Sequence, residues 1–279
     1  MAAGDGWIGM NPDWIGNLFW LFLALALLTP LAQSRLLQLR RDGGAQRLAR
    51  ARGSRVLTLI EHRETYRFLG VPFLHRDAAA DPERLLRAIA LAPKSVPLDL
   101  ILHTPGGEGL AAEQIAHALI RHPARVTVFV PHYALGGGTL LALAADEIAL
   151  DPNAVLGPVE ARVGPYPASA VLAAAGAGEA RDARTLILAG QARKAQAQTE
   201  ALVAELLLAG GASEERAAEV AGALTGGAWT PGYPIMLEEA QRLGLPVNPL
   251  LPPEVYALLD LYDTGPRSRP STGAVRLDG

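Results

Sequence analysis

The chain has 279 residues, of which 50% are hydrophobic and 19% are charged, and its formal net charge is −3. This length suits one large domain or one domain with an appendage, and the near-neutral charge argues against nucleic-acid binding. The absence of cysteine excludes disulfides, thiolate catalysis and cysteine-ligated zinc, and we expect neither a metal nor a cofactor.

The N-terminal region contains an apolar segment that is long enough to cross a bilayer. Residues 14–32 carry no formal charge, and as a helix of about 1.5 Å per residue they would extend roughly 29 Å. Arginines follow, so the positive-inside rule places the N-terminus outside and the main domain in the cytoplasm. A cleaved signal peptide is the alternative, but Asp5 and Asp13 precede the segment and no basic residue does. We therefore predict a single-pass anchor in the lipid bilayer.

The remaining chain divides by composition. We expect an extramembrane N-terminus, the anchor, a basic juxtamembrane helix, one α/β domain and a disordered tail that is poor in apolar residues. The corresponding ranges are 1–13, 14–33, 34–53, 54–262 and 263–279.

Short apolar runs alternate with helical patterns after residue 53. Such alternation predicts parallel strand–helix–strand units, and Asp81 followed by Pro82 predicts a helix start. The expected strands are 55–62, 98–104 and 125–131, and the expected helices are 81–92, 109–122 and 139–148, with a long Ala-rich helical region at 168–208.

Two glycine-rich turns follow consecutive predicted strands. The first is HTPGGEG, residues 103–109, and the second is YALGGGT, residues 133–139. Neither matches a nucleotide-binding fingerprint. Backbone N–H groups at a strand–glycine–helix turn suit an oxyanion, although either turn alone could be a tight connection.

Three segments resemble the serine dehydrogenase proteinase family, which is a membrane-bound relative of the signal peptide peptidases and Clp proteases. They are LHTPGG, PHYALGGGTLLALAADEIALDPNAVLGPVE and WTPGYPIMLEEAQRLGL, and the similarity runs from about Gly9 to about Leu250. The resemblance implies a crotonase/Clp-protease-like fold of stacked ββα units with an N-terminal transmembrane helix. It also implies a homo-oligomer that acts on peptide or membrane-protein segments.

The family's middle motif typically reads Ala-Met-Ser-Gly-Gly-Thr, and its serine is the nucleophile. Here the serine position is Gly136. The resemblance assigns the oxyanion hole to Gly107 and Gly137. It makes Lys194, 58 positions after Gly136, the candidate base, although a surface lysine is an equal alternative. The expected substrate groove comprises His103, Thr104, Pro105, Gly106, Gly138 and Thr139.

A second departure is found where the family commonly has Trp-Thr-His-Asp-Tyr-Pro, because Pro231 and Gly232 replace the histidine and the aspartate. Both departures indicate a protein that is catalytically silent. Thr139 and Ser169 are possible substitute nucleophiles, but neither lies in the strand-to-helix corner. His103 and His132 end their strands beside the turns, where they could act as acid–base groups or bind the backbone.

Three functions are therefore open. The first is a membrane-anchored serine peptidase homologue that cleaves or binds membrane-protein segments. The second is a non-catalytic oligomeric scaffold, which we expect to assemble through residues 182–208. The third is a crotonase-type acyl-CoA enzyme, for which Glu108 and Glu160 are candidate carboxylates.

Overall fold

The computed structural model describes residues 13–68, 71–78, 81–106, 109–177 and 182–262. The predicted N-terminal segment, apart from residue 13, and the predicted tail at 263–279 lie outside these ranges.

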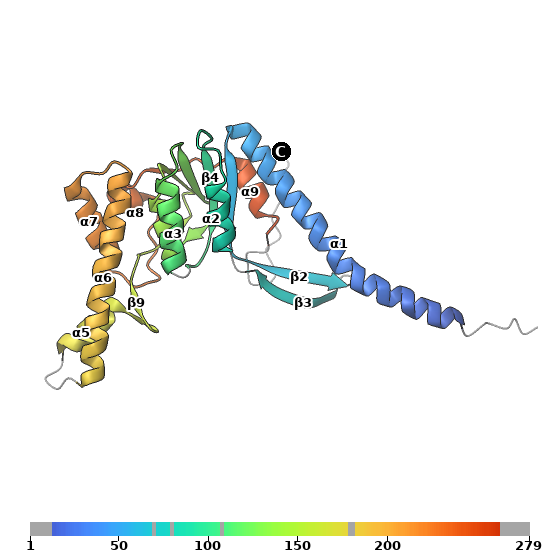
Figure 1. The fold of residues 1–279 in the computed structure, drawn as a ribbon, viewed down its shortest axis with the longest axis horizontal. Helices are drawn as coiled ribbons and strands as arrows, with labels where there is room; N and C mark the ends of the chain where they lie inside the picture. The colour runs from blue at the N-terminus through green and yellow to red at the C-terminus, as the bar shows by residue number, and fades with distance from the viewer. Residues whose placement is uncertain (1–12, 69–70, 79–80, 107–108, 178–181, 263–279) are drawn as a thin grey trace, which may run out of the picture.

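A parallel sheet forms the centre of the protein (Figure 1). Its strand order is β1-β4-β5-β7-β11, and every pairing is parallel, so the carboxyl ends of the strands share one edge. This confirms the predicted α/β class and the three predicted strands. The strands are β1 (Arg55–Ile60), β4 (Leu98–His103), β5 (Val126–Val130), β7 (Glu147–Leu150) and β11 (Val247–Asn248).

The two faces of the sheet are covered by different helices. In β4, Leu98, Leu100 and Leu102 contribute to a large core that also includes α2, α3, α4 and α6 residues. Ile101 points to the other face, where it packs with Leu48 of α1 and with α9 residues. Because side chains alternate along a strand and both faces are covered, β4 is buried throughout.

Helices α2 (Pro82–Ala90), α3 (Gly109–Ile120) and α4 (Gly137–Leu143) connect the strands. The predicted start of α2 is confirmed, since the Asp81 side chain accepts a hydrogen bond of 3.0 Å from the Arg84 N–H. The helix expected over 139–148 is wrong in its second half. There the chain pairs with β5 as β7, so sheet pairing prevails over the helical propensity of the alanine-rich sequence.

Two helices form an arm on the side of the sheet away from α1 (Figure 1). They are α5 (Ala168–Ala177) and α6 (Ala183–Ala209), which pack against each other and confirm the predicted helical region. The other elements outside the sheet are β2 (His62–Phe68), β3 (Val71–Ala78), β6 (Tyr133–Ala134), β8 (Val155–Leu156), β9 (Arg162–Val163), β10 (Tyr166–Pro167), α7 (Glu214–Thr225), α8 (Leu237–Arg242) and α9 (Pro253–Leu259).

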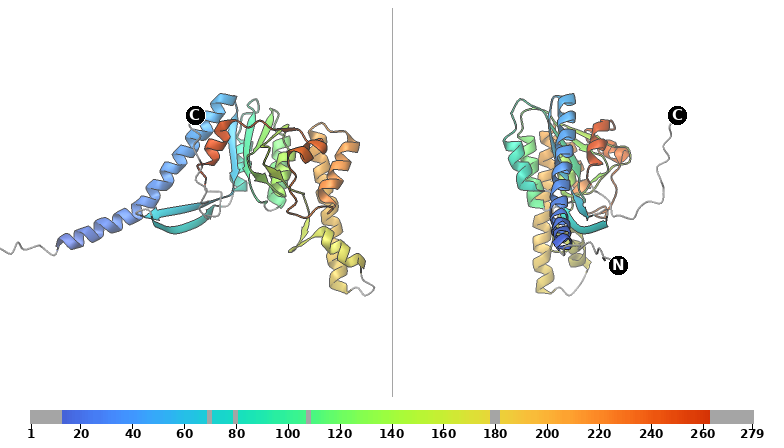
Figure 2. Two further views of the ribbon diagram at one scale, coloured as in Figure 1. Left: turned by 180° about the vertical axis from the view of Figure 1, so that it is seen from behind. Right: turned by 90° about the vertical axis from the view of Figure 1, so that its right-hand side faces the viewer.

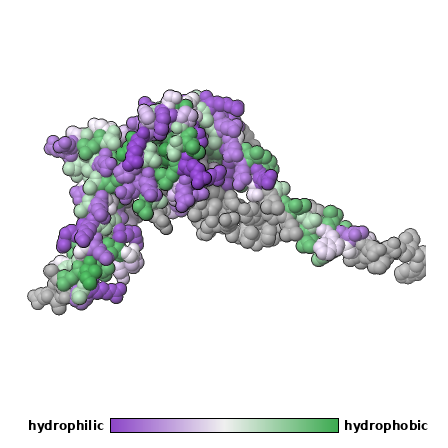
Figure 3. All heavy atoms as spheres, viewed as in Figure 1, coloured by the Kyte–Doolittle hydropathy of each residue, from purple (hydrophilic) through white to green (hydrophobic). Residues whose placement is uncertain are grey.

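Helix α1 (Asp13–Arg52) extends far from the body (Figures 1 and 2). Its C-terminal end is fixed by Arg52, whose Nε donates to Asp99 Oδ2 at 2.6 Å. Its N-terminal part presents apolar side chains to the surroundings (Figure 3), including Phe19 and Trp20, which are 59% and 65% exposed. Within the described ranges, no helix combines the length and apolar character that crossing a membrane requires. The predicted transmembrane helix is therefore not supported.

Candidate functional site

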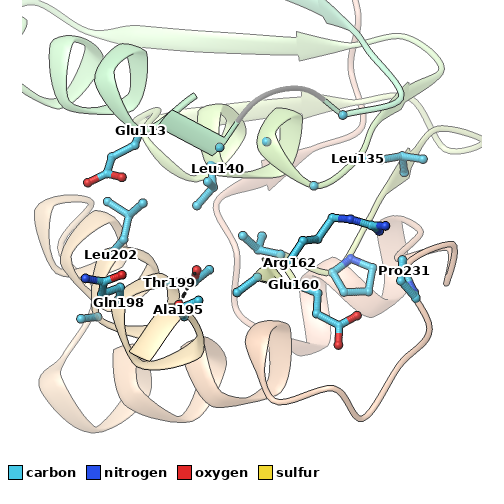
Figure 4. Close-up of a pocket in the computed structure, with 18 of the residues that line it drawn as sticks. Glu113, Leu135, Leu140, Glu160, Arg162, Ala195, Gln198, Thr199, Leu202 and Pro231 are labelled. Atoms are coloured by element: carbon cyan, nitrogen blue, oxygen red, sulfur yellow. Dashed lines mark hydrogen bonds between the residues drawn. The ribbon is translucent and has the colours of Figure 1, made fainter. Parts of the chain in front are cut away.

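The two glycine turns lie at the carboxyl edge of the sheet and open into one cavity of about 960 Å³. Helix α3 and helix α6 form two of its walls, and the segment after β8 forms a third (Figure 4). The cavity thus combines residues that are far apart in the sequence. It is lined by Pro105, Gly106, Gly109, Glu113, His117, Leu135, Gly136, Gly137, Leu140, Pro158, Val159, Glu160, Ala161, Arg162, Ala195, Gln198, Thr199, Ala201, Leu202, Glu205 and Pro231.

Gly136 occupies a sharp turn between β6 and α4. It is the N-cap of α4, with φ +51° and ψ −109°, a conformation that side chains rarely adopt. A Cβ built on Gly136 would meet no other atom within 4 Å. The turn therefore has the strained strand-to-helix geometry that presents the nucleophile in α/β-hydrolases, with open space where a side chain would project.

The backbone beside Gly136 includes an N–H group for which the helix provides no acceptor. Gly137 is the first residue of α4, so its N–H has no acceptor within the helix, and it lines the cavity. Gly106, with φ +112°, lines the cavity from the first turn. The Gly137 N–H can bind a carbonyl oxygen or an oxyanion, whereas the Gly106 N–H is bonded to Thr104 Oγ1. Gly107, the other expected donor, and Glu108 lie outside the described residues.

Gly138 and Thr139 support the turn from beneath and do not line the cavity. Thr139 is fully buried, and its hydroxyl lies 2.9 Å from both the Ala134 and Gly157 carbonyl oxygens and accepts from the Gly157 N–H at 3.1 Å. A Cβ on Gly138 would approach Thr104 Cγ2 to 2.7 Å. The two residues therefore hold the turn in place, and the Thr139 hydroxyl is committed to the backbone.

Thr104 links the first turn to β1. Its hydroxyl donates to Glu61 Oε1 at 2.6 Å and accepts from the Gly106 N–H at 3.2 Å. Thr104 is buried and lies behind the cavity rather than in it. Of the expected groove residues, the structure thus brings Pro105 and Gly106 to the cavity surface.

Neither of the histidines beside the turns lines the cavity. His132 is exposed. His103 is buried against the Tyr133 ring, with 4.2 Å between the ring centroids. Burial and, to a smaller extent, the nearby His132 lower the pKa of His103 to about 4. Burial together with Glu61 raises the pKa of Tyr133 above its ordinary value.

Lys194 is exposed on α6, and it is not among the residues that line the cavity, although the next residue, Ala195, is. Ser169 donates to Glu160, so its hydroxyl supports a cavity carboxylate and does not itself reach the cavity. Thr199 is the hydroxyl residue in the described lining, and its Oγ1 donates to the Ala195 carbonyl at 3.0 Å.

The segment that departs from the family motif borders the same cavity. Pro231 lines it, while the rings of Trp229 and Tyr233 stack in parallel with centroids 5.1 Å apart. The position of the missing histidine therefore lies in the lining of the same cavity as the glycine turns (Figure 4).

Sequence reasoning missed the ionisable residues on the cavity walls. Glu113 and His117 lie on α3, Glu205 lies on α6, and Arg162 is the first residue of β9. A signal was present, because positions 109, 113 and 117 repeat every four residues and so share one helix face. Their position opposite Glu205 depends on how α6 packs.

Comparison with known proteins identifies the chain's relatives. A family model for ClpP-like SDH-type serine proteinases matches residues 10–276. The uncharacterized protein MJ0137 of Methanocaldococcus jannaschii is 47% identical over 255 residues, covering 90% of this chain and 88% of its own. A second uncharacterized protein of that organism, MJ1495, is 44% identical over 254 residues, covering 91% and 87%.

Two solved structures show a more distant likeness. A variant of the 1510-N membrane-bound stomatin-specific protease is 19% identical, with a TM-score of 0.40, over 64% of this chain and 76% of its own. A ClpP1 variant from Listeria monocytogenes is 15% identical, with a TM-score of 0.43, over 76% and 98%. At these TM-scores the likeness adds nothing to the assignment that the sequence match provides. On that match, the chain belongs to the family of ClpP-like SDH-type serine proteinases.

Proposed function

We propose that this protein is a catalytically silent member of its family, which binds an extended polypeptide segment in the cavity without cleaving it. The observation that carries the proposal is Gly136. It occupies the sharp turn at the start of α4, where a side chain would project into open space, and a glycine offers no atom that can attack a carbonyl.

The other candidate nucleophiles support this proposal. Thr139 is buried and bonded to the backbone, and Ser169 is bonded to Glu160. Lys194 is exposed and outside the cavity lining, whereas a lysine base is activated by burial. Pro231 replaces a family histidine at the edge of the same cavity. The proposed loss of catalysis would thus involve several positions and not Gly136 alone.

Polypeptide binding is supported by what the cavity retains. Gly137 contributes the first backbone N–H of α4 to the lining, and Leu140 and Leu202 provide apolar surface. Backbone donors bind the carbonyl groups of an extended chain, while apolar walls accept its side chains.

The direct test is labelling with a fluorophosphonate, which reacts only with an activated nucleophile. We expect the unmodified protein to remain unlabelled and to leave casein intact. Gly136→Ala is the matched control for Gly136→Ser, because both add a Cβ at the strained position and only the serine adds a hydroxyl. Labelling of Gly136→Ser alone would support intact donors around the turn. Labelling of the unmodified protein would contradict the proposal.

We also propose that α1 attaches the protein to a membrane, with the main domain in the cytoplasm. Support comes from the exposed apolar side chains of Leu18, Phe19 and Leu21 and from the arginines that follow along the helix. Flotation with liposomes tests attachment, and we expect Ser substitutions at these three positions to leave the protein in the unbound fraction. Equal flotation of both proteins would contradict it.

Self-association is proposed through α6 in the arm. Leu186 and Ile187 are 49% and 62% exposed there, which suits a contact with a second copy. Light scattering of the detergent-solubilised protein at micromolar concentration tests this, and a monomer would contradict it.

One observation favours a second function, that of an acyl-CoA enzyme. Glu160 lies in the same cavity as the Gly137 N–H, so a carboxylate and an oxyanion donor are both available without a serine. Calorimetric titration with an acyl-CoA thioester distinguishes this function from polypeptide binding.

A further inference from the structure

The charged residues of the cavity differ in how firmly hydrogen bonds to their own segment hold them. Glu160 accepts a hydrogen bond from Ser169, and Arg162 donates to the Pro165 carbonyl, so both are held by their own segment. Glu113 and Glu205 are held less firmly. Their side chains are 48% and 57% exposed, and they project from α3 and α6 into the same cavity.

His117 is the described residue that approaches these two carboxylates. Its Nε2 lies 3.9 Å from Glu113 Oε1 and its Nδ1 lies 3.5 Å from Glu205 Oε1. Charge-assisted hydrogen bonds are shorter, about 2.7–2.9 Å. Both carboxylates therefore retain acceptor capacity for another cation.

The surroundings fit the side chain of a lysine or an arginine. Leu202 lies beside Glu113 and Gln198 in the gap between α3 and α6 (Figure 4), and Leu140 lines the cavity nearer to Gly136. A long aliphatic stem would pack on these leucines while its charged end reaches the carboxylates.

We propose that Glu113 and Glu205 make the cavity selective for polypeptide segments that carry a lysine or arginine. The basic side chain lies between α3 and α6 while the backbone of the segment reaches the glycine turns. This inference rests on the proposed polypeptide binding and adds the chemical class of segment that is bound.

The test uses fluorescein-labelled ten-residue peptides that are identical except for one central lysine, norleucine or glutamate. Their affinity for the full-length protein in detergent is measured by fluorescence anisotropy. We expect the lysine peptide to bind roughly three- to tenfold more tightly than the norleucine peptide, and the glutamate peptide to bind most weakly. The preference should decrease as salt is added.

The paired substitution Glu113→Gln with Glu205→Gln should remove the preference for the lysine peptide over the norleucine peptide. Glu215→Gln, on the exposed side of α7 and outside the cavity lining, is the matched control and should retain the preference. Equal binding of lysine and norleucine peptides by the unmodified protein would overturn the selectivity while leaving polypeptide binding intact. If no peptide binds, the proposed function fails, and the selectivity fails with it.

Discussion

The burial of His103 predicts that the protein loses stability in mild acid. The side chain is 2% exposed, and neither ring nitrogen has a hydrogen-bond partner among the described residues. The His132 ring lies 5.6 Å away, and the Tyr133 ring lies 4.2 Å away. Protonation of His103 in the folded protein would place a charge in this buried position, so its pKa is lowered from 6.5 to about 4.

The sign follows from the difference between the folded and unfolded chains. Between pH 6.5 and about 4, the unfolded chain takes up a proton at His103 and the folded protein does not, so acidification favours unfolding. At about 1.4 kcal/mol per pH unit, this residue costs about 2 kcal/mol at pH 5 and approaches about 3 kcal/mol near pH 4. Well above pH 6.5, His103 is neutral in both states, so the free energy of unfolding should no longer change with its protonation.

The measurement is urea unfolding of the full-length protein in detergent, followed by circular dichroism between pH 7.5 and pH 5. This range avoids most carboxylate titration, which occurs nearer pH 4. His103→Gln removes the titrating group and should flatten the pH dependence, whatever its own stability at pH 7.5. His132→Gln should flatten it only slightly, because burial is the larger cause of the lowered pKa.

The decisive comparison is between the loss of unfolding free energy on acidification in His103→Gln and the same loss in the unmodified protein. If both lose the same free energy of unfolding between pH 7.5 and pH 5, His103 is not neutral and buried in the folded protein. The reasoning from its burial would then be refuted.

Two further substitutions test the packing around the site and the attachment of α1. Gly138→Ala places a Cβ 2.7 Å from Thr104 Cγ2, and this overpacking should lower the free energy of unfolding by about 1–3 kcal/mol. Its Tm should be several degrees below that of the control Gly232→Ala, whose Cβ meets nothing within 4 Å. Equal Tm values for the two variants would contradict the close approach. Asp99→Asn removes the buried charge that pairs with Arg52. It should lower the free energy of unfolding in urea by about 2 kcal/mol. Unchanged stability would mean that this pair does not fix the end of α1.

The sequence was sufficient for the local features of the site. Gly136 and Pro231 could be identified as departures because the motifs around them are specific, and the start of α2 was evident from Asp81 because capping depends on neighbouring residues alone. The parallel sheet followed from the alternation of apolar runs and helical patterns, since buried parallel strands need continuous apolar stretches.

Tertiary packing determined what local patterns do not contain. The sequence alone does not distinguish Thr139, which is buried beneath the turn, from a groove residue, nor Lys194, which is exposed, from a buried base. Both outcomes depend on which face of a helix meets the sheet. Likewise, Glu113 and Glu205 face one cavity although they are distant in the chain, because α6 packs alongside α3. Burial and long-range proximity are properties of the folded chain, so the charge of the cavity became evident only in three dimensions.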